Sequence, residues 1–288
     1  MNIRELSPEL AKKAQVIGEN SDTLENDINE LRSWIEEQPH LISRKDDQFL
    51  LTFLRRCNFN LDESKKRIEA FLTCKTNYPD LYKDRAVDET ALDILKCGLV
   101  TIPPNSLPDN GPRLLITQVS KFDPKKHSLR DVMKVRFMLF EILTFEDDIT
   151  SISGLELVFD LQDCSLKQAL GLNPALLRKT YIYQDECIPL NIKHFHIINM
   201  KKELQGVVNL ARSMISTGTG FDIVIHEKES DLYKYIPQES MPVEYGGQNG
   251  THEKFLEEWE KILLDHVEYF EEDSFLGTNL ENSSCCIS

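Results

Sequence analysis

The sequence predicts an α/β protein in which a helical N-terminal lobe packs on a domain with a mainly parallel sheet. Up to about Lys96, apolar residues recur at helical spacing between charged ones, and beyond Gly98 short β-prone runs alternate with helical segments. Strands that alternate with helices favour a parallel sheet with crossover helices. We divide the chain into the lobe at 1–96, the α/β domain at 97–250, and a C-terminal helix with an acidic tail at 251–288.

The N-terminal lobe is expected to contain at least three helices. Leu24–Ile35 carries apolar residues at helical spacing. Ser43 and Asn60 are each followed three residues later by an acidic residue, which is typical of a helix start. The sequence Tyr78-Pro79-Asp80 ends this helical pattern.

The α/β domain is expected to contain five strands separated by helices. The predicted strands are Leu99–Ile102, Leu114–Val119, Leu155–Leu161, Phe195–Met200 and Phe221–His226. The predicted helices are Ser128–Phe145, Asn173–Cys187, Glu203–Ser216 and, after the domain, Phe255–Phe270. The segment after Glu271 is polar and acidic, so we expect a mobile tail.

Composition excludes several classes of protein. The net charge of -15 over 288 residues argues against a nucleic-acid partner, because such binding needs a basic surface. The N-terminus lacks an apolar signal-peptide core, and no apolar run reaches the length of a membrane span. We therefore expect a cytoplasmic protein. Seven cysteines without a Cys-x-x-Cys pair indicate neither a disulfide framework nor a zinc site.

Two motifs suggest chemistry, but the sequence does not support it further. Asp160 ends a predicted strand, yet no nucleophile elbow, phosphate loop or dinucleotide fingerprint accompanies it. His194 and His196 would project from one face of a strand, as zinc ligands can, and His226 on another strand is the one further candidate. No carboxylate stands at a useful spacing from them. We expect no metal, no cofactor and no enzymatic activity.

The predicted helix Glu203–Ser216 has a wide apolar face. That face comprises Leu204, Val207, Val208, Ala211 and Ile215, and Leu210 and Met214 widen it. A crossover helix that packs on the sheet explains such a face. A mobile lid over a cavity explains it as well, and Gly218 and Gly220 favour the lid because glycines absorb the dihedral changes of a hinge.

Four motifs in order carry a resemblance to a known family. They are Phe49–Phe59, Val158–Leu161, the segment from Ile188 to Asn199, and Pro242–Gly247 with its Pro-Val-Glu-Tyr-Gly-Gly sequence. Together they resemble the CRAL-TRIO family of lipid-transfer proteins, in the branch of the α-tocopherol transfer and retinaldehyde-binding proteins. The resemblance covers roughly Leu24 to Trp259. It implies a lipid-binding cavity between the sheet and a gate helix, here Glu203–Ser216.

The resemblance also implies which residues line that cavity. Carried over by position they are Met133, Phe140, Leu155, Phe159, Leu172, Thr180, Tyr183, Leu190 and Ile192, with Val207, Val208, Ala211 and Ile215 from the gate. Thr180 and Tyr183 are candidates to orient a ligand hydroxyl. The implied ligand is a tocopherol-like molecule, a retinoid, a carotenoid or a phospholipid, released when membrane contact opens the gate. The alternative is a regulatory interaction module that keeps the fold without ligand exchange.

Two departures from the family pattern bear on the ligand and the membrane. Arg136 and Phe140 stand where the tocopherol branch has small serines, which argues against α-tocopherol itself. The basic patch with which that branch binds phosphoinositides matches clearly at Lys193, and Arg55, Arg56, Arg178 and Lys179 are the possible substitutes for the rest. A phosphoinositide partner is therefore a candidate that rests on these five residues.

Overall fold

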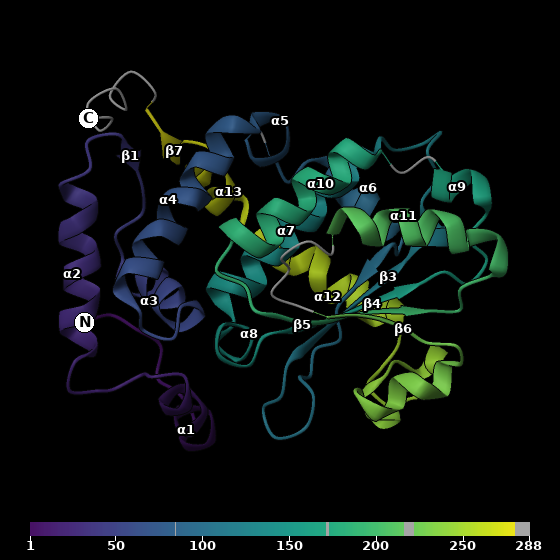
Figure 1. Cartoon of the computed structure of the whole chain (residues 1–288), viewed down its shortest axis with the longest axis horizontal. Helices are drawn as coiled ribbons and strands as arrows, with labels where there is room; N and C mark the ends of the chain where they lie inside the picture. Colours follow the sequence, from purple (N-terminus) through teal and green to yellow (C-terminus); the bar gives the residue numbers. More distant parts are fainter. Residues whose placement is uncertain (84, 171–172, 216–221, 280–288) are drawn as a thin grey trace.

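A five-stranded sheet forms the centre of the protein (Figure 1). The computed structural model describes residues 1–83, 85–170, 173–215 and 222–279. The strands are β2 (Val100–Thr101), β3 (Arg113–Gln118), β4 (Leu155–Asp160), β5 (Ile192–Ile198) and β6 (Asp222–Ile225), in that spatial order. β2 pairs antiparallel with β3 and the other pairs are parallel, so the predicted mainly parallel sheet is confirmed.

The parallel strands follow one another in chain order, and this determines where their helices lie. Right-handed crossovers between sequential neighbours put every crossover helix on the same face of the sheet. Figure 1 shows α7, α10 and α11 on one side of the sheet and the segment after β6 on the other. The crossover helices are α7 (Leu129–Glu146), α8 (Asp148–Ser153), α9 (Leu166–Leu170), α10 (Pro174–Ile182), the π-helix η2 (Tyr183–Cys187), η3 (Lys202–Leu204) and α11 (Gln205–Ile215).

The N-terminal lobe is helical, as expected. Its helices are α1 (Pro8–Val16), α2 (Leu24–Glu36), α3 (Asp47–Arg56), α4 (Leu61–Asn77), α5 (Pro79–Tyr82) and α6 (Glu89–Lys96). Asn60 caps α4, but α3 starts later than predicted, because Asp46 and not Ser43 accepts the hydrogen bond from the Phe49 amide. The lobe shares one apolar core with α7, in which Phe49 stacks on Phe145 with ring centroids 5.1 Å apart.

Short 3-10 turns cover the face of the sheet opposite the crossover helices. They are η4 (Glu229–Lys234), η5 (Gln238–Ser240) and η6 (Val243–Tyr245), and a further turn, η1 (Val119–Lys121), follows β3. Val158 packs there against Leu232 and Ile236. The motif Pro242–Gly247 closes this layer, and a Cβ on Gly247 would lie 1.9 Å from the Met241 carbonyl oxygen, so only glycine fits.

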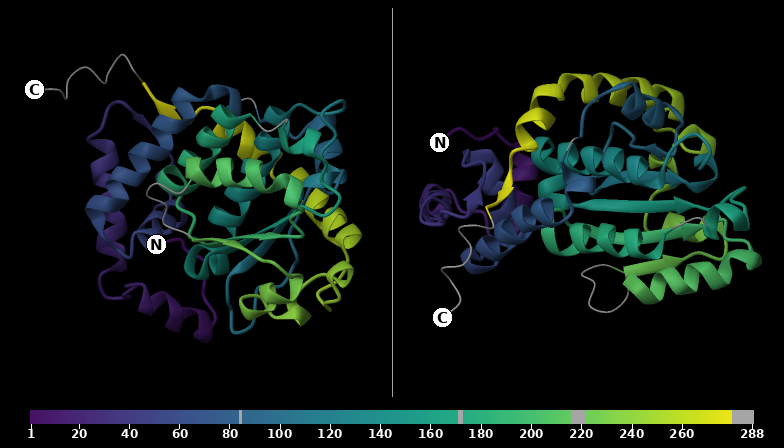
Figure 2. Two further views of the ribbon diagram at one scale, coloured as in Figure 1. Left: turned by 45° about the vertical axis from the view of Figure 1, so that its right-hand side comes forward. Right: turned by 90° about the horizontal axis from the view of Figure 1, so that it is seen from above.

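The C-terminal segment corrects two expectations. The helix predicted over Phe255–Phe270 is divided into α12 (His252–Asp265) and α13 (Val267–Asp273), which lie across α7 from α11 (Figure 2). Residues after Glu271 were expected to be a mobile tail, yet Asp273 is buried and β7 (Gly277–Thr278) pairs antiparallel with β1 (Leu41–Ile42) of the lobe. The charge of Asp273 is matched by buried cations, which a count of acidic residues in sequence does not reveal.

Candidate functional site

A cavity of about 170 Å³ lies between the sheet and the layer of crossover helices. Its floor is the face of the sheet on which Phe159 and Phe195 stack, with ring centroids 4.2 Å apart. α7 and α10 supply its sides, and Val207 and Val208 of α11 supply its roof. Among the described residues the wall comprises 25, and most of these are apolar. The polar ones are Thr117, Arg136, Thr180, Tyr181, Gln184 and Arg212.

The structure places some of the predicted cavity residues in this wall and others away from it. Those in the wall are Met133, Phe159, Thr180, Val207, Val208 and Ala211. Those buried in the main core and absent from the wall are Phe140, Leu155, Tyr183, Leu190 and Ile192. Leu172 and the side chain of Ile215 lie outside the described residues. Ligand contact by the residues in the wall stays a prediction.

The two hydroxyls proposed to orient a ligand are already used within the protein. Tyr183 donates its hydroxyl to Oε1 of Glu141, and burial raises its pKa well above the usual value. Thr180 donates its hydroxyl to the Leu176 carbonyl at 3.0 Å. Because Tyr183 also lies outside the wall, we do not retain it as a ligand contact.

Arg136 is one of the wall residues that the predicted lining did not include. It is 4 % exposed, and its guanidinium carbon lies 5.0 Å from the centroid of the Phe140 ring and 4.8 Å from that of Phe159. Its Nε and Nη2 atoms are buried without a hydrogen-bond partner among the described residues. Burial lowers the pKa of Arg136 to about 9, because the apolar surroundings disfavour the charged form.

Two other polar atoms of the wall are in the same state. The hydroxyl of Thr117 on β3 and the amide nitrogen of Gln184 on η2 are buried and, within the part of the chain that the structure describes, have no hydrogen-bond partner. Buried polar groups are normally paired, so three unpaired ones in a single wall are unusual. Gln184 also stands in a π-helix, a local irregularity that is frequent at functional sites.

Helix α11 differs in one respect from the expected gate. Val207, Val208 and Ala211 face the cavity, but Leu210, expected to widen the same face, is 53 % exposed. α11 therefore presents apolar side chains on both its inner and its outer side. The side chain of Met214 and the glycine-containing segment 216–220, the expected hinge, lie outside the described residues.

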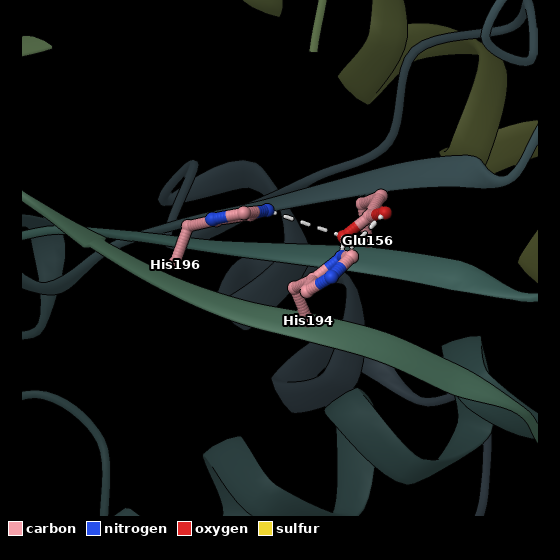
Figure 3. Close-up of side chains that lie close together, drawn as sticks. All are labelled: Glu156, His194 and His196. Carbon is pink, nitrogen blue, oxygen red and sulfur yellow. Dashed lines mark hydrogen bonds and ion pairs between the residues drawn. The ribbon is translucent and has the colours of Figure 1, made fainter. Parts of the chain in front are cut away.

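The opposite face of the sheet carries a polar cluster of Glu156, His194 and His196 (Figure 3). Glu156 lies beside His194 in the register of β4 and β5, and its carboxylate is 3.0 Å from His194 Nδ1 and 3.2 Å from His196 Nε2. The other ring nitrogen of His196 is 2.9 Å from His226 Nε2. The expectation that no carboxylate stands near the two histidines is therefore wrong.

This cluster is where the described residues could hold a metal ion. One ligand atom from each of Glu156, His194 and His196 lies within 4.8 Å of the others, and His226 would orient His196 from behind. Both ring nitrogens of His196 already have hydrogen-bond partners, so the same geometry also serves as a polar network that joins β4, β5 and the turn after β6.

Asp160 has a structural position. One carboxylate oxygen accepts the Tyr245 hydroxyl at 2.7 Å, and the other accepts the side-chain amide of Asn199 and the backbone amide of Gln162. These three bonds attach the end of β4 to its neighbouring loop and to the closing motif. The carboxylate is thus occupied in holding the fold.

The five basic residues of the predicted phosphoinositide patch lie in different environments. Arg55 is buried and holds Glu19 and Asp148, so it is structural. Burial and the positive charge of Arg56 lower the pKa of Lys193, against the opposing effect of Glu156. The remaining two, Arg178 and Lys179, are on α10.

The fold and the cavity define a protein with a mostly apolar cavity between a parallel sheet and a helical layer. Comparison with known families agrees. A family model described as CRAL/TRIO domain matches residues 105–247, and one described as Pinta-like, UBA domain matches residues 20–92. The match of residues 105–247 to the CRAL/TRIO domain confirms the family prediction, and CRAL-TRIO proteins bind and transfer lipids.

Curated relatives resemble the chain over most of its length. Human Clavesin-2 is 27% identical over 273 residues, which cover 93% of this chain and 82% of the relative. Mouse Alpha-tocopherol transfer protein-like is 24% identical over 269 residues, covering 92% and 77%. Clavesin-1 of Pongo abelii is 25% identical over 280 residues, covering 95% and 77%. Within the described residues, no helix is both long and apolar enough to cross a bilayer.

Proposed function

We propose that this protein carries a hydrophobic small molecule in the cavity beneath α11 and exchanges it with membranes when α11 opens. The observation that carries the proposal is the cavity itself, which is walled almost entirely by apolar side chains. Burial of apolar ligand surface contributes about 25 cal/mol per Å², so such a wall favours a molecule that water excludes. Membership of the CRAL-TRIO family supports the same class of ligand.

The size of the cavity supports an exchange that requires movement. A dry cavity of about 150 Å³ takes a molecule of the size of benzene. The cavity here is about 170 Å³, whereas a tocopherol-like molecule, a retinoid, a carotenoid or a phospholipid is several times larger than benzene. Entry of such a ligand therefore needs displacement of α11 or of the side chains beneath it.

Helix α11 is suited to membrane contact on its outer side. Leu210 is exposed there, and Lys201 and Lys202 are exposed just before the helix. Each cation near an anionic bilayer surface contributes about 1 kcal/mol, and such effects are local even on an acidic protein. Insertion of Leu210 into lipid would let the inner residues Val207 and Val208 leave the cavity for another apolar medium. Membrane and cavity thus compete for one helix.

The proposal is tested by two measurements on the full chain. Mass spectrometry of an organic-solvent extract of freshly purified protein should show a stoichiometric lipid. Vesicle-to-vesicle transfer of retinol and of fluorescent phosphatidylcholine should then be accelerated by the protein. Val208→Asp should reduce the transfer rate at least about tenfold, because it places a charge between the gate and the cavity.

Asn209→Asp is the matched control, since it adds the same charge one residue away on the exposed side of α11. Its transfer rate should stay within about twofold of the wild-type rate, as expected of a surface substitution. Equal rates for Val208→Asp and the wild type would remove α11 from the mechanism. Protein that is empty and binds no lipid on titration would favour the regulatory module instead.

A further inference from the structure

The unpaired guanidinium of Arg136 is the most informative polar group in the cavity wall. A charge buried in apolar surroundings is strongly unfavourable unless a counter-charge and hydrogen bonds compensate it. Arg136 stacks on Phe140 and Phe159, so aromatic rings contact the faces of the guanidinium plane, but these rings do not accept hydrogen bonds from the N–H groups at its edge. Because Nε and Nη2 are buried and unpaired, a compensating acceptor has to come from outside the described residues.

The position of the unpaired atoms indicates the shape of that acceptor. Nε and Nη2 form one edge of the guanidinium, and two parallel N–H groups on that edge match the two oxygens of a carboxylate. The same edge holds carboxylates elsewhere in this protein. Arg4 contacts both oxygens of Asp148 through Nε and Nη2, Arg44 does so with Asp46, and Arg55 with Glu19.

Thr117 provides a second donor in the same wall. It pairs in register with Phe159, and adjacent residues in register present their side chains to the same face of the sheet. Arg136 lies over the Phe159 ring, so Thr117 and the guanidinium both flank Phe159 in the cavity wall. The unpaired amide of Gln184 in the same wall is a third donor. Three unpaired donors in a mostly apolar wall favour an acceptor-rich group on an apolar ligand.

We propose that the cavity selects a long-chain carboxylic acid, whose carboxylate pairs side-on with Arg136 and whose apolar part fills the space under α11. This inference rests on the proposed function and narrows its ligand class. A neutral isoprenoid alcohol or aldehyde would leave the guanidinium uncompensated. A molecule with a terminal carboxylate supplies both the counter-charge and the two oxygens that the free edge of Arg136 requires.

The test compares two probes of equal chain length that differ in the terminal group, oleic acid and oleyl alcohol. Binding of each to the full chain is measured by displacement of a fluorescent apolar dye near neutral pH. The wild type should bind the acid at least about tenfold more tightly than the alcohol. Arg136→Met, which keeps an unbranched apolar chain of similar length, should abolish or reverse this preference.

Arg130→Met is the matched control, because Arg130 lies on the same helix with an exposed side chain and outside the cavity wall. It should keep the wild-type preference for the acid. Thermal unfolding without ligand shows whether Arg136→Met folds. Its unfolding temperature should not fall below that of the wild type, since an apolar residue replaces an uncompensated buried charge.

The outcomes separate this inference from the proposed function. If the wild type binds acid and alcohol equally, or if Arg136→Met keeps the preference for the acid, the carboxylate inference is wrong while lipid carriage stands. If neither probe binds and no lipid is extracted, the proposed function fails and the inference fails with it. If Arg136→Met unfolds at a markedly lower temperature, Arg136 has a structural partner, and the inference is overturned.

Discussion

Replacement of Glu141 by glutamine should destabilise the protein by about 3 kcal/mol. Glu141 lies on α7 and is fully buried, and both of its oxygens accept hydrogen bonds from Arg85 at 2.9 Å. Lys75 of α4 lies 3.2 Å from Glu141 and 2.8 Å from Asp273 of α13. These four residues form a buried network of two cations and two carboxylates that joins the lobe, the crossover layer and the C-terminal helix.

The magnitude follows from the charge balance of this network. Glu141→Gln keeps the shape but leaves two buried cations with one carboxylate, and loss of one partner from a buried ion pair costs about 3 to 5 kcal/mol. Against the penalty of burial, Arg85 and then Lys75 lower the pKa of Glu141 from 4.5 to about 2. At about 1.36 kcal/mol per pKa unit, that difference corresponds to roughly 3 kcal/mol of stability.

The assay is urea unfolding followed by circular dichroism near pH 7. Glu146→Gln on the same helix is the control, because its side chain is 41% exposed and it should change the free energy of unfolding by less than about 0.5 kcal/mol. The double variant Lys75→Met/Glu141→Gln restores the charge balance and should be less destabilised than the sum of its single variants. A loss below about 1 kcal/mol for Glu141→Gln, or strict additivity in the double variant, would refute the reasoning.

Two further predictions concern the histidine cluster and the basic residues. Burial lowers the pKa of His226 below 6.5, so the unfolded chain takes up protons before the folded protein does as the pH falls. The urea midpoint of unfolding should therefore be constant above about pH 7 and decrease from about pH 6.5 downward. The variant His226→Gln should weaken this decrease. Neutralising Arg56 and Lys193 together should weaken binding to vesicles containing phosphatidylinositol bisphosphate about 25-fold in a cosedimentation assay, since each cation contributes about 1 kcal/mol. Neutralising Arg178 and Lys179 should change this binding less than twofold, which is about 0.4 kcal/mol. Equal losses of vesicle binding for the two pairs would show that α10 belongs to the membrane surface. A urea midpoint that does not change with pH would show that His226 has the same pKa in the folded and the unfolded state.

The sequence was sufficient for the order of elements and for the type of sheet. Strand and helix patterns are local, and chain-order neighbours then restrict the topology to right-handed crossovers on one face. The position of Phe159 in the lining came from the family resemblance, whereas helical periodicity indicated the apolar face of α11. Phe159, Val207, Val208 and Ala211 all lie in the cavity wall, and their contact with a ligand stays a prediction.

Polar partners that are distant in sequence were harder to predict. Glu156 meets His194 only because β4 and β5 pair in a particular register, which no local pattern specifies. Asp273 was assigned to an acidic tail, although its carboxylate neutralises Lys75, which is 198 residues away in the sequence. A signal did exist at the other end of that network, since Glu141 is a single carboxylate inside the apolar run from Phe137 to Leu143. A lone charge in such a run predicts a buried partner.

Helix α7 shows why the cavity wall itself was only partly predictable. Nearly every residue from Val132 to Phe145 is buried, so the helix has no exposed face from which its rotation can be read. Met133 and Arg136 lie three residues apart and share the side that meets the cavity, while Phe140 is one turn further along and packs its ring on the guanidinium. Phe140 therefore positions the charge instead of touching the ligand. Arg136 and Phe140, which depart from the family pattern, therefore act together. An aromatic ring that holds a cation in an apolar cavity changes which ligand end group the cavity can accept.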